Sequence, residues 1–166
     1  MRTPLARGVL GVLLVTLAAC VGSSGNSASE EDIQQQADYW AISQIQQRFH
    51  EATSKKDINL MMSLYAPNAT LTIPKQTAVG TEQIREFWLT KSDAFHPDNR
   101  WISETPAYKI EITANGDQGT LHFECHYIDV EGKRLVVYLT ADQEVARIDG
   151  RWLITDMVVG SASLRP

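Results

Sequence analysis

Three ionisable side chains, His122, Glu124 and His126, alternate with apolar residues in the stretch 120–130. Successive side chains of a strand point to opposite faces, so this spacing predicts a strand with one polar and one apolar face. The apolar face would carry Leu121, Phe123, Cys125 and Tyr127.

A histidine beside a glutamate has the chemistry of a general base, because the carboxylate tunes the pKa of the imidazole. Two interpretations stay open. The polar face meets solvent or a partner subunit, or it lines an enclosed pocket. In a pocket, His126 or His122, aided by Glu124, would move a proton as the catalytic group.

A metal site at these residues is not predicted. His122 and His126 are four residues apart, roughly 13 Å along a strand, whereas zinc lies about 2 Å from each ligating nitrogen. Side chains of one straight strand therefore converge poorly on one ion, and a site would need His50 or His96 as well. We expect neither a metal nor a cofactor.

The N-terminal region is typical of an export signal. Arg2 and Arg7 precede a short apolar run, residues 8–19, which is too short to span a bilayer comfortably. The sequence Leu-Ala-Ala-Cys at 17–20 resembles the bacterial lipobox. That resemblance implies cleavage before Cys20 and attachment of lipid, palmitate included, to this cysteine. An ordinary secretory signal is the alternative.

The signal divides the chain into three parts: a lipoprotein signal peptide (1–19), the lipidated cysteine with a Gly/Ser-rich tether (20–29), and one domain (30–166). We therefore expect a cell-envelope protein that is lipid-anchored and faces the periplasm or the exterior. Cys125 would be the one cysteine of the folded domain, so no internal disulfide is expected there, and its strand position predicts a small buried side chain.

The charge excludes one class of partner. The chain has 15 basic and 20 acidic residues and a formal charge of −5, and loss of Arg2 and Arg7 leaves 13 basic residues and a charge of −7. No basic cluster is present, so nucleic acid is not an expected partner and membrane attachment would depend on the lipid.

Helices are expected before strands. Early acids after Ser29 predict the start of a long helix that ends near Lys55. Its core-facing stripe would be Ile33, Ala37, Ala41, Ile45 and Phe49, flanked by Trp40 and Ala52. Asp57 is expected to cap a second, short helix, and Thr81 a third.

Strand signals follow each other through the second half of the chain. A first short strand is expected at 69–73, before Pro74. Alternation then predicts strands at 101–113, 120–130, 134–148 and 151–163, with turns at 114–117, 131–132 and Asp149-Gly150. Helices followed by an antiparallel meander indicate an α+β fold.

Four motifs in this order resemble the nuclear transport factor 2-like superfamily, in particular its SnoaL-like branch. They are Phe49-His50-Glu51-Ala52, the run 64–70 (Leu-Tyr-Ala-Pro-Asn-Ala-Thr), the run 80–88 (Gly-Thr-Glu-Gln-Ile-Arg-Glu-Phe-Trp) and the run 147–152 (Arg-Ile-Asp-Gly-Arg-Trp). The likeness covers residues 32–162. It implies a conical α+β barrel in which three N-terminal helices pack on a curved antiparallel sheet with an internal pocket, often dimerising through the sheet.

The resemblance carries little chemistry to this chain. Ketosteroid isomerases use a tyrosine and an aspartate that correspond here to Phe49 and Ile73, and neither can exchange a proton. Dehydratases and dehydrochlorinases place an aspartate near Ser54, and the nearest acid, Asp57, is explained as a helix cap. Dehydratase-like members also carry a strand histidine in the pocket, which is the reason to keep His122 and His126 as candidates.

An aromatic-rich set is expected to line the pocket: Phe49, Tyr65, Ile73, Phe87, Trp88 and Trp101. Such walls suit a small, mostly apolar ligand. The leading hypothesis is a binding domain without catalysis. The alternatives are a cofactor-independent lyase, isomerase or cyclase with a strand histidine as base, and a structural homodimer whose pocket is filled by its own side chains.

Overall fold

The computed structural model describes residues 28–164. The predicted signal peptide and Cys20 lie outside the described residues. The chain forms, in order, α1 (Glu30–Lys55), α2 (Ile58–Met62), β1 (Tyr65–Ile73), β2 (Gln76–Val79), α3 (Gly80–Thr90), the 3-10 helix η1 (Asp93–Phe95), β3 (Trp101–Ser103), β4 (Lys109–Asn115), β5 (Gln118–Asp129), β6 (Arg134–Ile148) and β7 (Arg151–Ser163). The predicted α+β class is confirmed.

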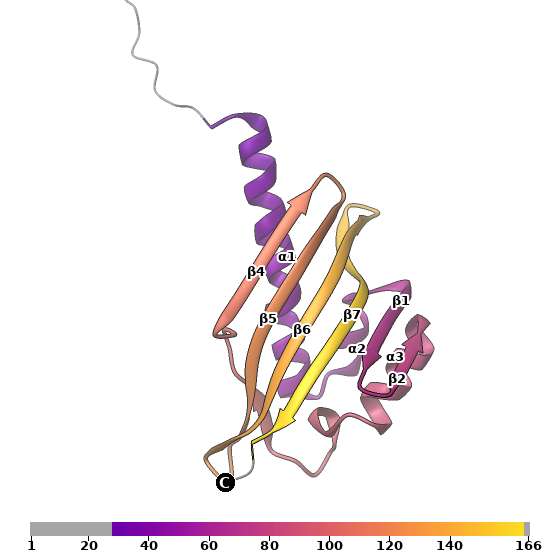
Figure 1. The fold of residues 1–166 in the computed structure, drawn as a ribbon, viewed down its shortest axis with the longest axis vertical. Coiled ribbons are helices and arrows are strands. Elements are labelled where there is room, and N and C mark those ends of the chain that lie inside the picture. The colour runs from indigo at the N-terminus through magenta and orange to yellow at the C-terminus, as the bar shows by residue number, and fades with distance from the viewer. Residues whose placement is uncertain (1–27, 165–166) are drawn as a thin grey trace, which may run out of the picture.

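The strands form one curved sheet in the order β2-β1-β7-β6-β5-β3, with β4 also paired to β5. In Figure 1 the sheet faces the viewer and α1 runs behind it. The sheet is mixed rather than purely antiparallel, because β1 runs parallel to β7. The expectation of an antiparallel sheet was therefore wrong at this one pair, where the strand that follows the first helices joins the last strand of the chain.

α1 begins at a capping box: the Ser29 hydroxyl accepts from the backbone N–H of Asp32, and the Asp32 carboxylate accepts from the backbone N–H of Ser29. The predicted stripe was wrong in this first half, since Ile33 is 60% exposed and Trp40 is 67% exposed. In Figure 1 the first turns of α1 project beyond the sheet. Ile42 is buried instead.

The second half of the predicted stripe is confirmed. Ile45, Phe49 and Ala52 are buried against the sheet. Phe49 contacts Phe123 of β5, with 5.3 Å between ring centroids. The inner face of β5 is buried as expected, Cys125 included.

Two strand boundaries differ from the prediction. β1 begins at Tyr65, four residues early, and β2 was not expected. The predicted single strand 101–113 is divided into β3 and β4, because Pro106 has no N–H for a ladder hydrogen bond and residues 104–108 leave the sheet. The Asp57 cap is confirmed, since its carboxylate accepts from the N–H groups of Asn59 and Leu60.

None of the helices in residues 28–164 is both long and apolar enough to cross a membrane.

Candidate functional site

The helix-covered side of the sheet contains a hollow of about 350 Å³. It lies between α3, the segment after it, and the strand ends nearest to them. Its walls are Ile73, Pro74, Phe87, Trp88, Lys91, Ser92, Asp93, Ala94, Trp101, Tyr127, Val137, Leu139, Val159, Ser161 and Ser163. We refer to this hollow as the α3 pocket.

Four of the six predicted pocket residues line the α3 pocket: Ile73, Phe87, Trp88 and Trp101. Phe49 and Tyr65 do not line it. Phe49 is fully buried beneath the pocket in edge contact with Trp88, with ring centroids 5.6 Å apart. The Tyr65 hydroxyl donates to the sulfur of Met157 at 3.1 Å. Both are core side chains.

Two residues of the pocket wall carry polar atoms that are buried without a partner among the described residues. They are the indole Nε1 of Trp88 and the hydroxyl of Tyr127. Burial raises the pKa of the Tyr65 hydroxyl, and the neighbouring Trp88 N–H opposes this rise. Buried polar atoms are normally paired, so these are two unsatisfied donors within the wall of the α3 pocket.

Sequence reasoning placed Tyr127 on the inner strand face but did not single it out. Its hydroxyl lies in the interior, and burial raises its pKa well above the ordinary value. It therefore stays protonated and offers a hydrogen-bond donor.

A buried polar group lies deeper under the helices and was also missed. Nδ1 of His50 forms a hydrogen bond with the Ser103 hydroxyl, which lies 3.8 Å from the sulfur of Cys125. Burial lowers the pKa of His50 to about 4 and raises that of the Cys125 thiol to about 12. Both groups are neutral at physiological pH, so the arrangement is not an activated nucleophile.

His122, Glu124 and His126 lie on the opposite, outer face of the sheet. None of them lines the α3 pocket. They therefore do not face a ligand in this pocket, because the alternation of β5 directs Tyr127 inward and its neighbours outward. The interpretation of a polar outer face is the one that the structure supports.

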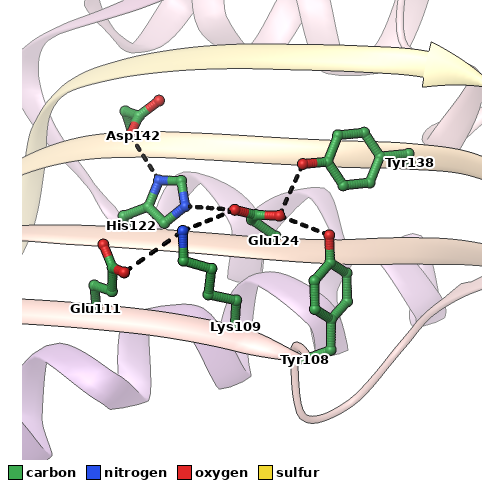
Figure 2. A network of polar contacts seen from close by, with 7 residues as sticks. All are labelled: Tyr108, Lys109, Glu111, His122, Glu124, Tyr138 and Asp142. Atoms are coloured by element: carbon green, nitrogen blue, oxygen red, sulfur yellow. Dashed lines mark hydrogen bonds and ion pairs between the residues drawn. The ribbon is translucent and has the colours of Figure 1, made fainter.

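Glu124 is the centre of a hydrogen-bond network on that face (Figure 2). Its carboxylate accepts from Tyr108 at 2.7 Å, Tyr138 at 2.8 Å, Lys109 at 3.0 Å and His122 at 3.3 Å. These bonds, led by that from Tyr108, lower the pKa of Glu124 to about 2. A carboxylate stabilised in this way is a weak base.

The two histidines are held by other carboxylates. Nδ1 of His122 lies 2.7 Å from Asp142, and Nδ1 of His126 lies 2.9 Å from Glu104. Partial burial lowers the pKa of His122, but the hydrogen bonds with Asp142 and Glu124 outweigh it and the net shift is upward. Within residues 28–164, no group of three His, Cys, Asp or Glu side chains could hold a metal ion.

Sequence comparison identifies a SnoaL-like domain at residues 34–158. The chain therefore belongs to the SnoaL-like domain family, as the motifs predicted. A search of curated protein sequences finds no match.

Solved structures with the same fold include three from bacteria. A protein of unknown function with a cystatin-like fold from Nostoc punctiforme has a TM-score of 0.66 and 20% identity, over 76% of this chain and 92% of that chain. A nuclear transport factor 2-like protein of unknown function from Pseudomonas putida has a TM-score of 0.66 and 16% identity, over 75% of this chain and 87% of that chain. A hexachlorocyclohexane dehydrochlorinase from Novosphingobium barchaimii has a TM-score of 0.66 and 16% identity, over 80% of this chain and 94% of that chain. At such identities the likeness shows the fold alone.

Proposed function

We propose that this domain binds a small, mostly apolar molecule in the α3 pocket without transforming it, while a lipid on Cys20 holds it at the outer side of a bacterial membrane. The aromatic rings of Phe87, Trp88 and Trp101 supply flat apolar walls. A hollow of about 350 Å³ falls within the usual range for small-molecule sites, roughly 300–1,000 Å³.

One observation carries the proposal: two wall residues, Trp88 and Tyr127, have buried donors without partners. Burial of an unpaired polar group is unfavourable by about 1–3 kcal/mol, so a ligand that accepts a hydrogen bond there gains more than contact area. The preferred ligand is therefore a flat apolar body with a carbonyl or similar acceptor.

The composition of the wall favours binding over proton transfer. The walls contain no histidine, and their one carboxylate belongs to Asp93, an exposed residue. The positions that act in ketosteroid isomerases hold Phe49 and Ile73. An enzyme that used His122 would have to hold its substrate on the outer face, where His122, Asp142 and Asp156 line an open hollow of about 310 Å³ that has no aromatic wall.

The test is a ligand titration of the domain, residues 21–166, with paired planar molecules that differ by one carbonyl oxygen. Tryptophan fluorescence should show saturable binding. Tyr127→Phe should weaken the carbonyl-bearing member between about twofold and tenfold and leave its hydrocarbon partner unchanged. Tyr138→Phe, which removes a hydroxyl on the outer face, is the matched control and should change neither.

A filled pocket gives the decisive comparison. Val159→Phe enlarges a side chain of the wall and should abolish binding of both molecules. The α3 pocket is not a ligand site if no molecule of the panel binds saturably to the unsubstituted domain. The same conclusion follows if the Val159→Phe domain binds these molecules as tightly as the unsubstituted domain.

A further inference from the structure

After the exposed acids of its first turn, Glu30, Glu31 and Asp32, the outward side of α1 carries no exposed charge over four turns. Between Ile33 and Gln47 the one charged residue is Asp38, which is buried and forms an ion pair with Arg147 at 2.8 Å. Ile33 and Trp40 are seven residues apart, two helical turns, and therefore lie on the same side. They are 60% and 67% exposed, so an apolar stripe faces away from the sheet.

A small hollow of about 180 Å³ lies beside this stripe, and Trp40 forms part of its wall. Leu64 and Trp152 make the wall apolar, while Arg48 and Arg151 bring two guanidinium groups to it. Among the described residues, neither arginine forms an ion pair with a carboxylate. Guanidinium groups bind phosphate oxygens with matched geometry.

The position of the stripe in the chain points to a membrane. α1 begins at Glu30, ten residues after Cys20. Ten residues span at most about 36 Å when fully extended, which is similar to the length of α1 itself, about 39 Å. A lipid on Cys20 would thus hold α1 within reach of the bilayer surface. The domain as a whole is acidic, and an uncharged side can approach a phospholipid surface at the lowest electrostatic cost.

We propose that the outward stripe of α1 (Ile33, Ala37, Trp40 and Gln44) lies on the bilayer that holds the anchor, with Arg48 and Arg151 at phosphate headgroups. This inference rests on the lipid anchor of the proposed function. Tryptophan is enriched at membrane interfaces because one side of its ring is apolar and its N–H is polar.

A second copy of the chain fits the stripe less well. Fifteen helical residues cover a length of about 22 Å and a width of about 10 Å. That area, roughly 220 Å², is far below the approximately 800 Å² that each partner buries in a stable interface. The membrane contact needs no such area, because the anchor already supplies most of the binding free energy.

The experiment uses the full chain, processed by a bacterial host and reconstituted into phospholipid vesicles, with or without bromine on the acyl chains. Subtracting the emission of Trp40→Phe from that of the unsubstituted chain isolates Trp40. An interfacial helix places its apolar side roughly 5–10 Å into the headgroup and acyl boundary. We therefore expect brominated lipid to quench the Trp40 emission and to leave the emission of Trp40→Phe unchanged.

Two variants test the stripe directly. Ile33→Glu together with Ala37→Glu should remove the quenching of Trp40. Leu89→Glu, at an exposed apolar residue of α3, is the matched control and should retain it. Arg48→Gln together with Arg151→Gln should reduce the quenching, and unaltered quenching would overturn the role of the arginines.

The outcomes separate the anchor from the docking. A processed chain that does not sediment with vesicles overturns the anchor, and the docking with it. A chain that sediments but whose Trp40 is not quenched overturns the docking alone. The Trp40 emission could instead shift to shorter wavelength as the protein density on the vesicles rises, without quenching by brominated lipid. That result would assign the stripe to contact with a second copy of the chain and overturn the membrane contact.

Discussion

Replacement of Tyr127 by phenylalanine is predicted to stabilise the ligand-free domain while it weakens ligand binding. Tyr127 is 4% exposed, and its hydroxyl has no hydrogen-bond partner among the described residues. Phenylalanine keeps the ring and its contacts, including the stacking on Trp101 at 6.2 Å between centroids. The substitution therefore removes an unpaired polar atom and little else.

The magnitude follows from the state of that hydroxyl. A buried polar group without a partner costs about 1–3 kcal/mol, and the loss of the hydroxyl removes this cost. For a domain of this size, 1 kcal/mol corresponds to roughly 3–5 °C in Tm. We expect the Tm of Tyr127→Phe to rise by about 3–15 °C.

Thermal unfolding of the domain, followed by circular dichroism without ligand, measures this shift. Tyr138→Phe is the matched control, because the Tyr138 hydroxyl donates to Glu124 at 2.8 Å and its loss should lower the Tm. An equal or lower Tm for Tyr127→Phe would show that the hydroxyl is already paired in the free protein. The ligand selectivity argued for the α3 pocket would then lose its basis.

Four further outcomes are expected. The double variant His122→Gln/His126→Gln should bind ligand as the unsubstituted domain does, because both residues lie outside the α3 pocket; a large loss of affinity in the fluorescence titration would contradict this. The folded-state pKa of His50 is about 4, below its ordinary value of 6.5. In the unfolded chain His50 takes up a proton first as the pH falls, so stability should decrease by about 3 kcal/mol between pH 6.5 and pH 4. Urea unfolding across this range should show the loss, and His50→Gln should flatten it. Cys125 should resist thiol reagents until the domain unfolds, because its thiol is buried and its pKa is raised to about 12; rapid labelling of the native protein would refute this. Cys20→Ser should leave an unprocessed precursor that a fatty-acid analogue does not label, whereas equal labelling would remove the anchor.

Local alternation predicted one part of the site well. The period of two in β5 separated Leu121 and Phe123 from His122 and Glu124 correctly, because opposite faces of a strand are a property of the chain itself. Which face would meet a cavity could not be derived in this way. That choice depends on where α1 and α3 pack, and those contacts join residues far apart in the sequence.

The buried polar residues show the limit of pattern reasoning most clearly. Asp38 and His50 were not part of the predicted core-facing stripe of α1, since a polar residue on a helix usually faces water. Their burial depends on Arg147 and Ser103, which lie 109 and 53 residues away. The exposure of Ile33 likewise depends on the length of α1 relative to the sheet, which no local pattern records.

The outer histidines cannot be recruited to the α3 pocket by a change of rotamer. His126 and Tyr127 are neighbours on β5, and their side chains leave opposite faces of the sheet. Only a slip of β5 by one residue would exchange them, and it would also turn Leu121 and Phe123 out to solvent. Such a slip would bury the Glu124 carboxylate without the four groups that now donate hydrogen bonds to it. The free energy lost in this way is larger than the free energy that ordinary ligand contacts supply. Proton chemistry on a molecule in the pocket would therefore fall to the titratable groups of its own wall, Lys91, Asp93 and Tyr127. Burial keeps the Tyr127 hydroxyl protonated by raising its pKa, which agrees with the proposal that the domain holds its ligand unchanged.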